Sequence, residues 1–169
     1  MTQNHQTNYT KDSENKKIHV TREFDASIEQ VWKAWTDSTL LDQWWAPKPY
    51  KAKTKSMEFR QGGQWLYAMV GPDGTEQNCC VQYESIADKQ MFSGTDAFCD
   101  AAGNIDHSFP SMHWTCRFLQ QGDRTRVEVE VTFKSLEDLQ KIVEMGFQEG
   151  FAAAHGNLDE ILQQQAVAS

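Results

Sequence analysis

The sequence has no long apolar run and no excess of basic residues, and both shortages exclude classes of protein. No stretch approaches the roughly 20 apolar residues of a membrane-spanning helix, so we expect no membrane insertion. Lys and Arg number 16 against 24 Asp and Glu, and the resulting net charge of −8 repels phosphate backbones. We therefore expect no nucleic-acid partner. The first residues are polar and carry no apolar core of a signal peptide, so a cytoplasmic protein is predicted.

Cysteine and histidine are also scarce, and their spacing is not typical of a metal site. Cys79 and Cys80 are adjacent, so on a strand they point to opposite faces. No C-x2-C or H-x3-H spacing occurs, which disfavours a site built from the four cysteines with His107 and His113. We expect reduced thiols that act as small hydrophobes, with no metal and no cofactor.

Aromatic side chains are plentiful, with six Trp and nine Phe among 169 residues. Such rings usually build a core or line a pocket. The chain is 39% hydrophobic and 24% charged, which is typical of one globular domain. We predict a disordered arm over residues 1–16 and a single domain over residues 17–165.

Periodicity predicts a strand and two short helices at the start of this domain. Residues 18–24 alternate between apolar and polar, as in a half-buried strand. Ser27 and Gln30 have the spacing of a capping box, which begins a helix over residues 28–35. A second short helix is expected over residues 37–45, capped by Asp37 or Ser38 and ended by Pro47.

The rest of the chain is predicted to form a meander of strands and one long helix. The expected strands lie near residues 51–60, 64–70, 75–86, 90–98, 111–120 and 124–134. Ser135 then begins a helix that the apolar periodicity extends to residue 163, about 43 Å at 1.5 Å per residue. This order predicts an α+β fold, in which a curved antiparallel sheet of about six or seven strands wraps around the C-terminal helix.

Several segments of the sequence together form a recognisable pattern. They are residues 31–37 (VWKAWTD), 44–47 (WWAP), 60–65 (RQGGQW), 71–74 (GPDG), 145–150 (MGFQEG) and 157–162 (NLDEIL). In this order they resemble the SRPBCC, or START-like, superfamily, and within it the branch named for the activator of Hsp90 ATPase. The resemblance implies a helix-grip fold with a cavity between sheet and helix. One departure is the turn at residues 87–89, where relatives often carry two prolines.

The resemblance also implies a set of functions. Related domains bind lipids, steroids, polyketides or plant hormones, and some are cyclases, hydratases or drug-sequestering proteins. The named activator carries this domain behind a separate N-terminal domain, for which these 169 residues leave no room. We therefore expect a module that binds a small apolar or amphipathic ligand. A cyclase-like or hydratase-like enzyme and a co-chaperone-like interaction protein are the alternatives, and a homodimer is one option for the oligomeric state.

The candidate ligand-binding residues share the inward faces of the expected strands and of the long helix. They are Trp65, Tyr67, Tyr83, Trp114, Cys116, Gly146, Phe147, Gly150 and Phe151. Plain core packing is the alternative for each aromatic ring. Each of the two glycines costs a helix about 1 kcal/mol relative to alanine, so each needs a packing reason or leaves room for a ligand.

Polar candidates for acid–base chemistry are fewer. The enzyme alternative would use Tyr67 or Tyr83 with Asp96 or His113 as a proton donor or base. No nucleophile elbow or zincin motif occurs, so no catalytic residue is assigned. His155, late on the long helix, is expected to be exposed, or else a polar group at the pocket mouth.

Overall fold

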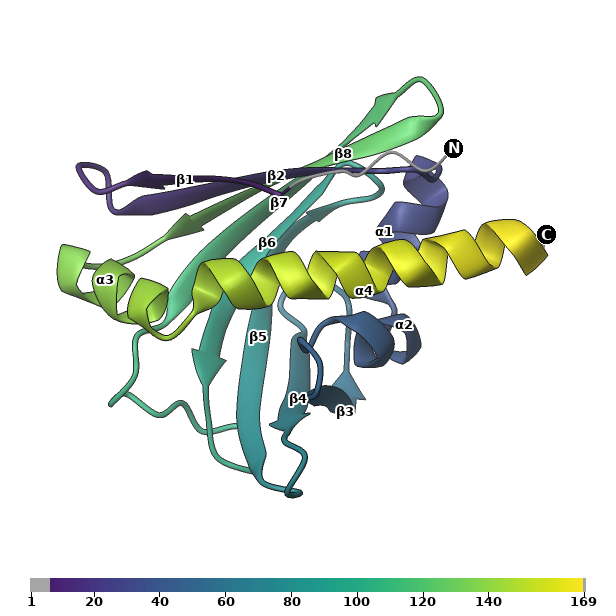
Figure 1. Ribbon diagram of the computed structural model, residues 1–169. Helices are drawn as coiled ribbons and strands as arrows, with labels where there is room; N and C mark the ends of the chain where they lie inside the picture. The colour runs from purple at the N-terminus through teal and green to yellow at the C-terminus, as the bar shows by residue number, and fades with distance from the viewer. Residues whose placement is uncertain (1–6, 169) are drawn as a thin grey trace.

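The computed structural model describes residues 7–168, and side chains up to residue 165 (Figure 1). Within this range the elements are, in order, β1 (Asn8–Asp12), β2 (Lys17–Phe24), α1 (Ile28–Thr36), α2 (Ser38–Trp44), β3 (Lys51–Met57), β4 (Gln64–Val70), β5 (Glu76–Ala87), β6 (Met91–Phe98), β7 (Met112–Gln121), β8 (Arg124–Thr132), α3 (Leu136–Glu144) and α4 (Phe147–Ala168). None of these helices combines the length and apolar character that crossing a membrane requires.

The strands form one antiparallel sheet in the order β1-β2-β8-β7-β6-β5-β4-β3. Figure 1 shows α4 lying across one face of this curved sheet, with α1 and α2 near its C-terminal half and α3 before its start. The predicted α+β helix-grip fold is therefore confirmed, with eight strands in the described residues where six or seven were expected.

The paired strands β2 and β8 supply part of the buried core. Ile18 and Val20 of β2 lie opposite Val131 and Val129 of β8, and none of the four is more than 3% exposed. Burying each such side chain stabilises the fold by about 1.5 to 3 kcal/mol. The alternation that predicted these strands therefore also identified their buried face.

The two short helices begin where their capping residues predict. The Ser27 hydroxyl accepts a hydrogen bond from the Gln30 amide, and Gln30 Oε1 accepts one from the Ser27 amide at 3.2 Å. Asp37 Oδ1 accepts from the Thr39 amide at 2.8 Å and caps α2. The Ser27 cap confirms the prediction, and of the two residues predicted to cap the second helix it is Asp37 that does so.

The C-terminal half of α4 is held by polar contacts on two sides. Asn157 Nδ2 donates to the carbonyl oxygens of Ala46 at 3.1 Å and Trp44 at 3.4 Å, at the end of α2. On the other side Arg22 of β2, which is buried, forms an ion pair with Asp159. These contacts fix the distance between this half of the helix and the sheet.

The prediction of a disordered arm over residues 1–16 is wrong for residues 8–12, which form β1 and pair with β2. Asp12 accepts hydrogen bonds from the Asn15 amide at 3.2 Å and from its side chain at 2.9 Å, and this contact closes the turn between the two strands. β1 is polar and joins the sheet edge by backbone hydrogen bonds, which apolar periodicity does not reveal. Residues 1–6 lie outside the described part.

The prediction of one helix over residues 135–163 is also wrong, because the chain turns at Gly146. Met145 and Gly146 donate backbone hydrogen bonds to Lys141 and Val143, and these bonds close the end of α3. Gly146 has a φ of +92°, a left-handed conformation in which a helix commonly ends. The apolar periodicity continues across this break, so it predicted a single helix.

Substitutions at two glycines of this region are expected to have opposite effects on stability. Gly146→Ala places a Cβ in the left-handed conformation, and we expect the free energy of unfolding to fall by about 1 to 2 kcal/mol. Gly156→Ala lies inside α4, where an added Cβ meets nothing within 4 Å, so a gain of up to about 1 kcal/mol is expected. Urea denaturation measures both; equal effects would contradict the assigned role of Gly146.

His155 is neither exposed nor at the pocket mouth, contrary to the sequence expectation. It is 1% exposed, and its Nδ1 lies 3.0 Å from the hydroxyl oxygen of Thr7, just before β1. Burial, with the nearby Arg22 charge, lowers the pKa of His155 to about 3. The side chain is therefore neutral in the folded protein and links α4 to the start of β1.

This histidine should make the fold sensitive to acid. Its folded pKa lies below the unfolded value of 6.5, so its contribution is complete above pH 6.5 and is lost as the pH falls toward 3. Between pH 7 and 5, wild type should lose about 2 kcal/mol more than His155→Phe, which cannot titrate. Urea denaturation at both pH values measures the difference; parallel losses would contradict a neutral buried histidine.

Candidate functional site

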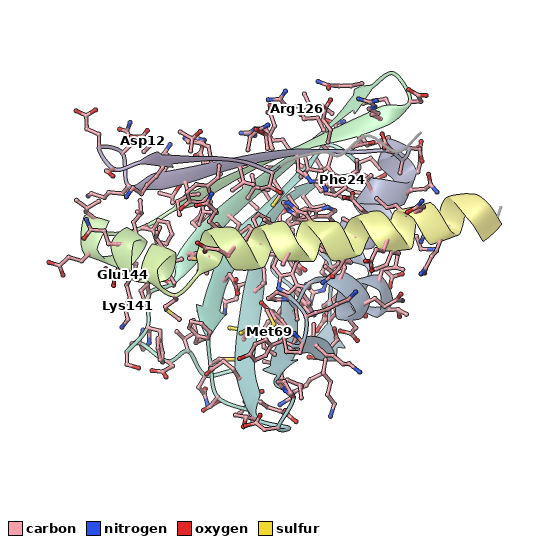
Figure 2. All side chains as sticks on the ribbon, viewed as in Figure 1. Asp12, Phe24, Met69, Arg126, Lys141 and Glu144 are labelled. Carbon is pink, nitrogen blue, oxygen red and sulfur yellow. The ribbon has the colours of Figure 1, made fainter. Side chains whose placement is uncertain are left out.

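A pocket of about 470 Å³ opens between the sheet, the end of α3 and the first turns of α4. Figure 2 labels Met69 of β4, which lines this pocket, on the opposite side of α4 from Phe24 of β2. Tyr50 and Met145 border the pocket and are 49% and 51% exposed, so they mark its mouth. The pocket therefore lies at the end of α4 that the Asn157 contacts do not hold.

Five aromatic rings form one wall of the pocket. They are Trp45, Tyr67, Trp114, Phe147 and Phe151. The ring centroid of Trp114 lies 5.8 Å from Trp45, 5.8 Å from Phe147 and 5.4 Å from Phe151. Tilted and edge-on contacts of this kind are favourable between aromatic rings, so Trp114 connects the ring of Trp45 to those of α4.

The nine predicted site residues divide into two groups. Six line the pocket: Tyr67, Trp114, Gly146, Phe147, Gly150 and Phe151. The other three lie deeper, around a hollow of only about 30 Å³: Trp65, Tyr83 and Cys116. Trp65 stacks on Tyr67 with centroids 4.0 Å apart, so it supports the wall from behind. Contact of any of the nine with a ligand stays a prediction.

Gly150 leaves space where α4 passes over the pocket. A Cβ at this position would lie 3.7 Å from Cγ of Pro47, an ordinary contact distance. An alanine would therefore fit, and a larger side chain would enter the volume between α4 and the residues that border the pocket. The glycine keeps this volume open.

Three polar side chains meet on the apolar surface of the pocket, from three neighbouring strands: Tyr67 of β4, Cys79 of β5 and Asp96 of β6. Trp45 Nε1 donates a hydrogen bond to the Tyr67 hydroxyl at 3.0 Å. Asp96 is 8% exposed and has no ion pair within residues 7–168. It is the one acidic or basic side chain among the described lining residues.

Burial dominates the protonation of these groups. Burial raises the pKa of Asp96 to about 7, although a hydrogen bond from the Ala97 amide opposes the change. Burial, and then the charge of Asp96, raises the pKa values of Tyr67 and Cys79 above their usual range. Tyrosine and cysteine are therefore neutral here, whereas the carboxyl group gains or loses its proton near neutral pH.

Sequence reasoning did not include Trp45, Cys79 or Asp96 among the ligand-binding residues. Asp96 was named only as an acid or base for the enzyme alternative, although its strand carried a usable signal. Phe92, Gly94 and Phe98 alternate with the period of β6, and Asp96 is the only charged member of that inward face. Trp45 follows α2, so helix periodicity did not relate it to the sheet.

Two further polar predictions have different outcomes. His113 is wrong as a pocket acid or base, because its side chain is exposed and its Nε2 lies 2.8 Å from Glu84 Oε1. His113 directly precedes Trp114 on β7, and consecutive strand residues point to opposite faces, so His113 faces away from the pocket. Cys79 and Cys80 do point to opposite faces, as predicted: Cys79 lines the pocket and Cys80 packs with Ala97 and Cys99. Within residues 7–168 no three potential metal ligands come together.

A curved antiparallel sheet around a long helix, with an apolar pocket between them, defines the helix-grip, or START-like, class. The chain belongs to the family of activator of Hsp90 ATPase homolog 1-like proteins, whose model matches residues 25–163. Members of this family generally bind hydrophobic ligands.

Solved structures agree with this assignment. The solution structure of a protein from Arthrobacter aurescens is 33% identical, covers 93% of this chain and 91% of that one, and has a TM-score of 0.88. A crystal structure of a protein from Mycobacterium smegmatis is 27% identical, with 93% and 96% coverage and a TM-score of 0.85. The AHSA1 protein from Silicibacter pomeroyi is 18% identical, with 88% and 99% coverage and a TM-score of 0.71, which supports the fold alone. No curated protein matched the chain.

Asp96→Asn is expected to stabilise the protein in a pH-dependent way. The folded pKa of about 7 lies above the unfolded value of 3.8, so the stability from this group is complete below pH 3.8 and is lost as the pH rises through 7. At pH 8 the variant should gain about 4 kcal/mol over wild type, and at pH 4 the gain should fall below about 1 kcal/mol. Urea denaturation at both values measures this; an equal gain at both would show that ionisation is not the cause.

Proposed function

We propose that the protein binds a small apolar or amphipathic molecule in the pocket between α4 and the sheet. The observation that carries this proposal is the pocket of about 470 Å³ beside an aromatic wall. Small-molecule sites are typically of about 300 to 1,000 Å³, mostly apolar, with a few polar groups. The three polar groups at Tyr67, Cys79 and Asp96 fit that description.

Apolar exposure at the pocket mouth supports the same function. The exposed large hydrophobic side chains within the described residues are Tyr50, Leu119, Leu136 and Met145. Two of them, Tyr50 and Met145, border the pocket. An apolar ligand would cover them on entry, so their exposure is useful to a binding protein. Scattered Leu119 and Leu136 offer less support for the co-chaperone-like alternative.

Filling the pocket from α4 should abolish binding. Gly150→Leu adds a side chain toward the pocket beside Pro47, and we expect affinity for the neutral dye N-phenyl-1-naphthylamine to fall at least tenfold. Gly156→Leu is the matched control, because it adds the same side chain to the same helix where an added Cβ meets nothing within 4 Å. Dye fluorescence measures both affinities, and circular dichroism checks folding. Equal losses in both variants, or no dye binding by wild type, would contradict the proposal.

Native mass spectrometry of protein purified from its own host addresses the natural ligand. A retained small molecule would give its mass and class, and the same spectra would report the oligomeric state. A complex that loses the molecule in Gly150→Leu but keeps it in Gly156→Leu would connect that molecule to this pocket.

An enzyme on the same scaffold is the second candidate, and the meeting of Tyr67, Cys79 and Asp96 favours it. A carboxyl group with a pKa of about 7 can donate or accept a proton near neutral pH. A retained ligand that is converted to a product by wild type, but not by Asp96→Asn, would support this function. Unchanged ligand after prolonged incubation would leave binding as the function.

A further inference from the structure

Resting on the proposed function, we propose that the ligand is an amphipathic amine. The Asp96 carboxylate binds its ammonium group at the inner end of the pocket, and the aromatic wall encloses its apolar body.

The position of Asp96 on the sheet makes it the natural anchor. It lies opposite Val81 of β5 and Met112 of β7, and it borders both the pocket and the deeper hollow. Its carboxyl group therefore lies at the inner end of a mostly apolar pocket, where a ligand that fills the pocket would reach it.

The protein supplies no positive charge to this carboxylate. No lysine, arginine or histidine is among the described residues that line the pocket, and Asp96 has no ion pair in residues 7–168. A buried, unpaired carboxylate is costly, and it either takes up a proton or finds a cation. A ligand ammonium group would supply the missing counterion.

None of the titratable neighbours of Asp96 can act as its positively charged counterion. The charge of Asp96 interacts with Tyr67 on β4 and with Cys79 and Tyr83 on β5. It also interacts with Cys80 and Cys99, which pack together on the other face of the sheet. All five are acids whose pKa values are raised, so they stay neutral and none becomes a cation. The residues of α3 and α4 that line the pocket carry no titratable side chain.

The aromatic wall favours a cation for a second, independent reason. The faces of indole and phenol rings attract ammonium groups, by about 0.5 to 2 kcal/mol according to solvent exposure. Trp45, Tyr67 and Trp114 line the same pocket as Asp96, and their rings are buried or half-buried. An anionic ligand would be repelled by the Asp96 carboxylate and by a chain with a net charge of −8.

Two probes of the same shape test the charge preference. 1-Naphthylmethylamine is protonated between pH 5 and 8, and 1-naphthalenemethanol is its neutral counterpart, which can still donate a hydrogen bond to a carboxylate. At pH 8 we expect wild type to bind the amine at least tenfold more tightly than the alcohol, by isothermal titration calorimetry. In Asp96→Asn the two affinities should agree within about threefold, because the ammonium group then has no counterion.

The pH dependence of wild type provides a second reading that needs no variant. At pH 5 Asp96 holds its proton, so the preference for the amine should shrink at least threefold relative to pH 8. A preference that persists unchanged at pH 5 would overturn the role of Asp96.

The outcomes separate this inference from the proposed function. Equal binding of amine and alcohol by wild type would overturn the amine inference and leave an apolar binding pocket. Failure of both probes and of N-phenyl-1-naphthylamine would overturn the proposed function itself. A preference for the amine that survives in Asp96→Asn would overturn the inference. If Gly150→Leu also binds the amine as tightly as wild type does, the cation site lies outside this pocket.

Discussion

The polar contacts of Asn157 and Asp159, which fix the C-terminal half of α4 in place, are the constraint on which the rest of the structure depends. Asn157 and Asp159 connect this half of the helix to the end of α2 and to β2. The chain turns at Gly146 before α4 begins, and the first turns of α4 lie over the pocket. Between these first turns and the strands the volume stays open, and the pocket lies at the end of α4 away from the contacts of Asn157 and Asp159.

This arrangement separates stability from function along one helix. The held half packs into the core: the buried ring of His155 contacts Phe24 of β2 and Trp35 of α1, and each buried apolar group adds to the free energy of unfolding. The pocket half gives up some of that stabilisation, because an empty volume loses the contacts that side chains would make across it. Aromatic rings that contact one another limit this loss, since each ring keeps neighbours on the wall even while the pocket is empty. The buried carboxyl group of Asp96 is a further cost that a structural role alone does not explain.

Period-2 and capping patterns predicted most of the fold, because they report burial and local hydrogen bonds directly. Ser27, Asp37 and the alternation on β2 are examples. Two predictions of the fold failed because these patterns do not report what decides the structure there. β1 is held by backbone hydrogen bonds to β2, and Gly146 ends a helix although the apolar periodicity continues beyond it. For the site, six of nine predicted residues line the pocket, since the faces of their strands were predictable. Trp65, Tyr83 and Cys116 lie deeper because the depth of a pocket depends on how closely the helix approaches each strand, which no spacing along the chain encodes.

Two buried titratable groups, His155 and Asp96, act on stability in opposite directions over nearly the same pH range. As the pH falls from 6.5, the unfolded chain protonates His155 and the folded protein does not, so stability falls. As the pH falls from 7, the folded protein protonates Asp96 and the unfolded chain does not, so stability rises. Over most of the range from pH 4 to 6.5 the two slopes oppose each other, and the wild-type profile alone reveals neither group. A bound ammonium group would hold Asp96 in its charged form and remove its slope. The ligand would then make the complex sensitive to acid through His155, a group that lies outside the pocket residues.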